Sequence, residues 1–132
     1  MKSIMLGHLP WVALGGAMGA TLRYILVALV TEWAGKAFPW GTLFVNVLGS
    51  FILGGCFVYI MERLGGHPEL RAIIIVGMLG ALTTFSTFAL EIWGFLEHAQ
   101  WGLAVLYALS SVVLCVLSVS AGILVARQVF VV

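Results

Sequence analysis

Gly80-Ala81-Leu82-Thr83-Thr84-Phe85-Ser86-Thr87-Phe88 is the stretch that decides the fold of this chain. It lies inside the uncharged run 72–90, which is long enough to cross a bilayer. Four hydroxyls within five positions are unusual in hydrocarbon, because a buried polar group costs free energy unless it finds a partner. Ser and Thr side chains also compete for backbone carbonyls and so disfavour regular helix. Irregular backbone at membrane depth needs cover from protein or water, so the stretch predicts a broken transmembrane helix that lines a site for something small.

The composition is that of an integral membrane protein. Of the 132 residues, 63% are hydrophobic and only 8% are charged, whereas soluble domains carry about 25% charged residues. At about 20 residues per span, the chain has room for four helices with short links and for no soluble domain. We therefore expect a single all-α, multi-pass domain over 1–132. The net charge of +1 gives no indication of nucleic-acid binding.

Turn residues divide the chain into four predicted transmembrane helices, and the third helix contains the break near 80–88. Lys and Arg are distributed only weakly in favour of cytoplasmic termini, which leaves the orientation open. The predicted spans are about 9–30, 39–61, 69–98 and 101–125. The first span carries two pairs of small residues that allow close helix approach, Gly15/Gly19 and Gly16/Ala20.

Polar side chains share one face of the second span and one face of the fourth. One interpretation is that they hold the helices together through hydrogen bonds and close packing. The other is that they line a narrow hydrophilic track together with the break, and the Asn46 amide would then offer donors to an anion or a carbonyl. The face residues are Thr42, Asn46 and Ser50 in the second span and Tyr107, Ser111, Cys115 and Ser118 in the fourth.

Arg23 and Glu91 are the ionisable residues deepest in their spans. Charges inside a membrane are expensive and usually face a cavity or each other. A structural Arg23–Glu91 pair, within or between subunits, is therefore one interpretation. Glu91 as a proton relay is a second, and Arg23 as a source of positive potential at a pore vestibule is a third.

Phe85 and Phe88 are three positions apart and would share a face of a helix. Packing against lipid or core is the usual role of such a pair. An aromatic ring also has a positively polarised edge, which could attract a small anion in a dry pore without offering a full charge. The break itself contains no cationic side chain, and weak coordination at several sites is what rapid passage requires.

The same residues resemble the signature of the Fluc (CrcB) family of fluoride channels. The break followed by Glu91 carries the resemblance, together with Trp40-Gly41-Thr42-Leu43-Phe44-Val45-Asn46 and Leu22-Arg23-Tyr24. The similarity covers all four spans. It implies an antiparallel, dual-topology homodimer in the plasma (inner) membrane of a microbe, in contact with lipid, that lets fluoride leave the cytoplasm by two pathways.

The resemblance also implies roles for particular residues. A structural Na⁺ at the centre of the dimer would be held by backbone carbonyls of Gly80 and Thr83. Phe85 and Phe88 would be the pore aromatics and Asn46 a donor in the pore. The polar track would be extended by Thr42, Ser86, Thr87, Glu91, Tyr107 and Ser111, with Arg23 nearby.

Two other classes compete with a fluoride channel. A small multidrug-type proton-coupled exporter is also a four-span dimer, but the first span here has Arg23 and no acidic residue before Glu32. A structural membrane subunit would use its polar residues only to bind helices together. An enzyme is not expected, because no serine has a histidine base at membrane depth and no cluster of metal ligands is visible in the sequence.

Overall fold

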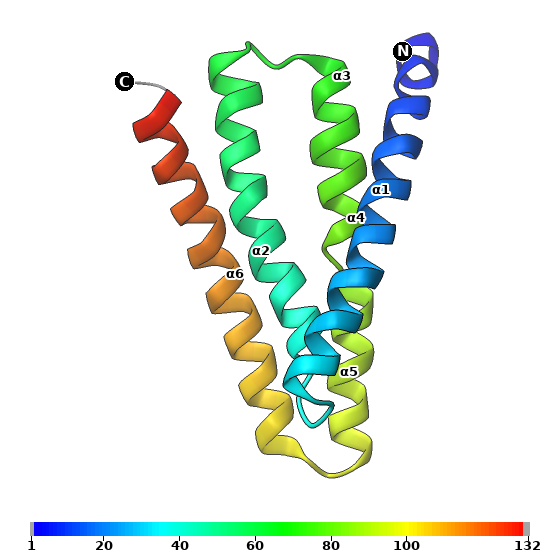
Figure 1. The fold of residues 1–132 in the computed structure, drawn as a ribbon, viewed down its shortest axis with the longest axis vertical. Coiled ribbons are helices and arrows are strands. Elements are labelled where there is room, and N and C mark those ends of the chain that lie inside the picture. Colours follow the sequence, from blue (N-terminus) through cyan, green and yellow to red (C-terminus); the bar gives the residue numbers. More distant parts are fainter. Residues whose placement is uncertain (1, 131–132) are drawn as a thin grey trace.

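Residues 2–130 are described by a computed structural model, and this part of the chain forms helices joined by short links, with no strand (Figure 1). The start of α1, the end of α6 and the link before α3 lie at one end of the molecule, and the α1–α2 and α5–α6 links lie at the other. The elements are α1 (Lys2–Ala34), α2 (Trp40–Phe57), the π-helical η1 (Val58–Arg63), α3 (Pro68–Leu70), the π-helical η2 (Arg71–Leu79), α4 (Gly80–Leu82), α5 (Phe85–Glu97) and α6 (Trp101–Phe130).

Within residues 2–130, four helical segments are long and apolar enough to cross a membrane, as predicted. The chain is thus a multi-pass membrane protein. Three of the four C-terminal ends lie further along the chain than expected, because a helix continues until a residue can end it. The first segment reaches Ala34 and not residue 30, since Gly35 is the first residue with a left-handed backbone (φ 88°), and its N–H donates to Thr31 O at 2.9 Å. The four segments are Leu6–Ala34, Trp40–Arg63, Pro68–Glu97 and Trp101–Phe130.

The predicted break in the third span is confirmed, and it is confined to two residues. Thr83 (φ −82°, ψ 153°) and Thr84 (φ −149°, ψ 122°) are extended between α4 and α5. The Thr84 hydroxyl oxygen accepts a hydrogen bond from the Thr87 N–H at 3.2 Å and so caps the start of α5. Gly80–Leu82 and the residues from Phe85 onward are helical, so the interruption is narrower than the hydroxyl-rich stretch suggested.

Glycines on α1 bring this helix into backbone contact with η2. A side chain at Gly15 would overlap the carbonyl oxygen of Ile73, and one at Gly19 would overlap that of Met78. The predicted Gly15/Gly19 pair therefore does pack against a helix. Gly16, of the second pair, has nothing within 4 Å of the position that a Cβ would take.

Two clusters of buried side chains lie on either side of the break. Leu43, Phe88 and Tyr107 form one, with Phe38 and Phe95 packed against it. The other cluster consists of Val45, Leu79 and Leu82. Both clusters include residues of α2, so this helix supports the break from both sides and fixes its position.

Candidate functional site

Asn46 on α2 binds the backbone of the break. Its Nδ2 donates to Thr84 O at 3.0 Å, and its Oδ1 accepts from the Thr84 N–H at 2.7 Å. The side-chain amide thus gives one extended residue the two hydrogen bonds that a neighbouring strand would give. Nδ2 carries a second hydrogen that this pairing does not use.

The break releases carbonyls from the helical ladder. In a continuous α-helix, the Thr84 N–H would donate to Gly80 O and the Thr87 N–H to Thr83 O. Here the Thr84 N–H donates to Asn46 and the Thr87 N–H to the Thr84 hydroxyl. Gly80 and Thr83, the residues predicted to present carbonyls to a cation, therefore both lose their helical donors, as the other carbonyls of the turn before the break also do.

Glu91 on α5 accepts hydrogen bonds from two buried hydroxyls. Thr42 Oγ1 donates to its Oε1 at 2.7 Å and Tyr107 OH donates to its Oε2 at 2.7 Å. Three helices, α2, α5 and α6, are joined at this one carboxyl group. Among the side chains that the structure describes, those of residues 6–130, the salt bridges are His67–Glu69 and Glu62–Arg127, so Arg23 and Glu91 do not pair within the chain.

Aromatic rings of the α1–α2 link, α2, α5 and α6 make a continuous cluster beside Glu91. Phe85 and Phe88 have ring centroids 5.4 Å apart. Phe88 also packs edge-to-face on Tyr107 at 5.0 Å, and Phe38 does so at 5.2 Å from the other side. The two break phenylalanines differ in burial: Phe88 is 9% exposed, whereas Phe85 is 77% exposed. Phe85 therefore points away from the rest of the fold.

A groove of about 360 Å³ lies between α2, the break and α6. We call it the Phe85 groove. It is mainly apolar, but several polar groups open into it, and one of them, the buried Ser111 hydroxyl, has no hydrogen-bond partner among the described residues. Its lining includes Asn46, Ser50, Thr83, Thr84, Phe85, Phe88, Ser111 and Cys115.

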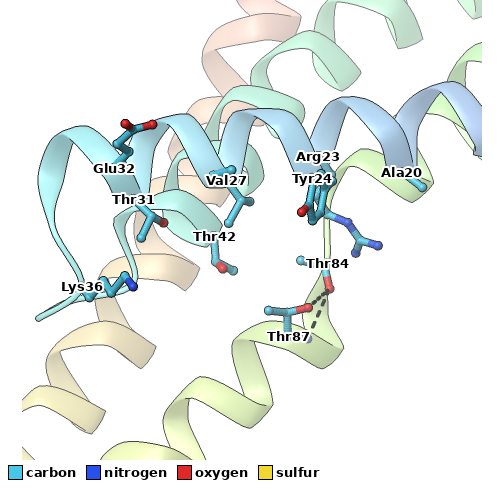
Figure 2. A pocket seen from close by; sticks show the side chains of 11 residues that line it. Ala20, Arg23, Tyr24, Val27, Thr31, Glu32, Lys36, Thr42, Thr84 and Thr87 are labelled. Carbon is cyan, nitrogen blue, oxygen red and sulfur yellow. Dashed lines mark hydrogen bonds between the residues drawn. The ribbon is translucent and has the colours of Figure 1, made fainter.

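A larger open groove of about 810 Å³ runs along α1, and we call it the Arg23 groove. In Figure 2, the Arg23 guanidinium extends from α1 on the side where Thr84 and Thr87 lie. Thr42 lines the same groove, with Lys36 nearer the α1–α2 link. Arg23 thus lies near the break in a groove along α1, whereas the Phe85 groove lies between α2, the break and α6.

Comparison with known proteins fits this architecture. Residues 10–123 match the family described as "CrcB-like protein, Camphor Resistance (CrcB)". This chain is a member of the CrcB family. It is 57% identical to a relative in Hahella chejuensis over 92% of this chain and 96% of the relative. It is 51% identical to one in Magnetococcus marinus, over 92% of this chain and 99% of the relative. Both relatives carry the name "Fluoride-specific ion channel FluC", which is the name of a channel and not of an enzyme.

The predicted site residues of this CrcB protein fall into connected groups. Asn46, Thr83, Ser86 and Thr87 gather around Thr84, whose hydroxyl donates to Thr87 Oγ1 at 3.1 Å and lies 3.4 Å from Ser86 Oγ. Thr42, Glu91 and Tyr107 form the second group, and Phe88 joins the two. Ser111 opens into the Phe85 groove, whereas Arg23 stands apart in its own groove.

Some polar residues of the two helical faces only bind helix backbone. Ser50 donates to Asn46 O of its own helix at 2.6 Å, and Ser118 donates across to Val47 O at 2.8 Å. Phe38 packs on Tyr107, but the sequence analysis did not predict it as a site residue. It lies in the α1–α2 link, and hydrophobic periodicity gives no information about residues outside helices and strands. Gly49 was also not predicted as a site residue, although it lies against Thr83 of the break.

Proposed function

We propose that this CrcB protein is a passive, fluoride-selective channel that exports fluoride from the cytoplasm down its electrochemical gradient. The names of its relatives support fluoride as the ion. The observation that carries the proposal is the chemistry of the residues that line the Phe85 groove. They include Ser111, whose buried hydroxyl has no partner among the described residues, Asn46, whose Nδ2 has a second N–H, and two phenylalanines.

These groups suit a small anion that is bound only weakly as it passes through the channel. Hydroxyl and amide donors replace part of a hydration shell, and ring edges add a weak positive potential. No Lys or Arg is among the residues that line the groove in the described chain, so nothing there would hold an anion strongly. Selectivity then follows from size, because a narrow track with few donors suits fluoride and excludes the larger chloride.

In this proposal, Glu91 lies on the fluoride path between the Phe85 groove and one end of the molecule. Glu91 borders a third open space, of about 540 Å³, which Lys36, His98 and Gln100 also line. Glu91 is joined through Tyr107 to Phe88, which lines the Phe85 groove. A polar track of Thr42, Glu91, Tyr107 and Ser111 would thus lead from the helix ends, past the phenylalanines, toward the break.

The working unit in this proposal is an antiparallel homodimer embedded in lipid, with two fluoride pathways. The outward position of Phe85 supports it, since a ring that is 77% exposed leaves its groove open on one side. A second copy would close the groove and present its own side chains to the pathway. The groups on one chain alone line only one wall.

A structural Na⁺ at the centre of that dimer would be held by backbone carbonyls of Gly80 and Thr83. The residues fit this ion, because both carbonyls have lost their helical donors to Asn46 and Thr84, and unwound carbonyls are the ligands that membrane proteins use for Na⁺. Such an ion would supply a fixed positive charge at the breaks. Asn46 and the Thr84 cap would keep the carbonyls available.

The proposal is tested by ion efflux from liposomes that contain the purified protein, in Na⁺ buffer. Fluoride release is followed with a fluoride electrode under a K⁺ gradient clamped with valinomycin, and chloride release is measured in parallel. We expect rapid, voltage-driven release of fluoride and negligible release of chloride. Fluoride release that follows a proton gradient and not voltage would indicate a coupled exporter, and no release from well-folded protein would refute transport.

A further inference from the structure

Gly49 on α2 lies against the break at a point where a side chain would not fit. It is three positions from Asn46, so both residues face the same way on the helix. A Cβ at Gly49 would stand 2.5 Å from Thr83 Cγ2 and 3.6 Å from Leu82 Cδ2. Carbon atoms at optimal separation are about 3.5–4.0 Å apart, so the Thr83 methyl occupies the space that the missing side chain leaves.

The Thr83 side chain cannot simply turn away from such a group. Its Oγ1 donates to Leu79 O at 3.0 Å, and a β-branched residue is stiff about χ1. Rotation of the methyl group would break this hydrogen bond, because the hydroxyl and the methyl share one carbon atom. An added methyl at Gly49 would therefore push on the Thr83 backbone.

We propose that Gly49 is a positioning residue for conduction: by having no side chain it lets α2 contact Thr83, and so keeps the Thr83 carbonyl and the Asn46–Thr84 pairing in place. This inference rests on the proposed channel function. Displacement of Thr83 moves the first residue of the break, and its neighbour Thr84 carries both hydrogen bonds to Asn46. Conduction would then be disturbed although Gly49 touches no ion.

The test pairs Gly49→Ala with Thr83→Ser, which removes the one methyl group in the way and keeps the hydroxyl for Leu79 O. We expect fluoride efflux per reconstituted protein to fall about tenfold or more in G49A, since functional sites tolerate displacements of only about 0.5 Å. In the double variant G49A/T83S the rate should return to that of T83S alone. If G49A does not fold, the double variant should both fold and conduct.

Gly54→Ala is the matched control on the same helix. Its new methyl would overlap Val119 O on α6, so it crowds α2 at least as strongly but away from the break. We expect T83S to leave the defect of G54A unchanged. Rescue of G54A by T83S would show a general effect on stability and would overturn the inference.

Hydrogen–deuterium exchange of residues 80–87 gives a readout that does not depend on transport. We expect faster exchange of the Thr84 amide in G49A, because its bond to Asn46 is disturbed, and wild-type exchange in G49A/T83S. Wild-type exchange and efflux in G49A, or a double variant that stays impaired, would overturn the role of Gly49. Absence of fluoride efflux from the wild type would refute the proposed function instead, and the exchange data would then still show whether the contact holds the break.

Discussion

The side-chain amide of Asn46 replaces the helix as hydrogen-bond partner of Thr84. Asn46 Oδ1 accepts a hydrogen bond from the Thr84 N–H at 2.7 Å, and Asn46 Nδ2 donates to the Thr84 carbonyl oxygen at 3.0 Å. A broken helix at membrane depth must satisfy its backbone groups inside the protein, and here a single residue of a neighbouring helix does so. The break is therefore an ordered part of the fold that depends on contacts with α2, and not a local loss of helical order.

Asn46→Ala should destabilise the protein by about 2–4 kcal/mol, because two backbone groups lose their partners and each unpaired buried group costs about 1–3 kcal/mol. The free energy of unfolding in mixed micelles measures this. Ser50→Ala is the matched control: its hydroxyl bonds only its own helix at 2.6 Å, so the change should be small. Equal stability of N46A and the wild type would contradict the pairing.

Tyr107→Phe should weaken the junction at Glu91 while leaving the aromatic packing in place. A typical hydrogen bond contributes about 0.5–1.5 kcal/mol, and the Phe ring can still pack on Phe88. Thr42→Val removes the other donor to the same carboxyl group at similar volume. Since both hydroxyls bind Glu91, the two changes should be coupled by at least about 0.5 kcal/mol in a double-mutant cycle of unfolding free energies. Strict additivity would show that the two hydrogen bonds are independent.

The sequence predicted the membrane class, the four spans and the break, because these depend on composition and on local chemistry. The hydroxyls of 83–87 disfavour helix wherever they stand, so the break could be placed without any tertiary information. Its narrow extent could not be predicted. It depends on the cap by Thr84 and on Asn46 from another helix.

The sequence predicted which polar residues share a face of a helix, but not which groups on other helices they would bind. Periodicity shows which residues share a face of one helix, but not how that helix is rotated against its neighbours. Glu91 thus binds the hydroxyls of Thr42 and Tyr107, whereas a pair with Arg23 looked equally reasonable in sequence. For the same reason, the sequence could not show that Gly15 packs and Gly16 does not.

Phe88→Leu should lower fluoride efflux about two- to tenfold, which corresponds to the 0.5–1.5 kcal/mol that aromatic edge contacts typically contribute. Stability should change by less than about 1.5 kcal/mol, because the swap keeps an apolar side chain of similar size. Efflux is measured in liposomes at matched protein content. Phe57→Leu is the control, since Phe57 lines an apolar groove that Met61 and Ile123 also line and that includes no residue of the break. Unchanged efflux in F88L would remove the aromatic edge from the mechanism.

Na⁺ should stabilise the purified protein if the Gly80 and Thr83 carbonyls bind it. A ligand at about 100 times its Kd adds about 2.7 kcal/mol to the unfolding free energy, which is seen as a higher Tm in NaCl than in N-methylglucamine chloride. The gain should shrink in Asn46→Ala, because Thr84 loses both hydrogen bonds that hold it and the neighbouring carbonyls lose their fixed position. Identical Tm values in the two salts would refute the site.

Gly15→Ala should destabilise the contact between α1 and η2. The new methyl would overlap the Ile73 carbonyl oxygen, and this backbone atom cannot move aside as a flexible side chain would. Overpacking of this kind costs about 1–3 kcal/mol, measured as the free energy of unfolding in mixed micelles.

Gly16→Ala provides the comparison one position further along α1. Nothing lies within 4 Å of its Cβ position, so the change should be neutral or stabilising by up to about 1 kcal/mol, since Ala favours helix more than Gly does. A loss of stability in G16A similar to that in G15A would mean that a partner outside the chain covers this face of α1. That outcome would support a second copy packed there, because a lipid chain would yield to one methyl group.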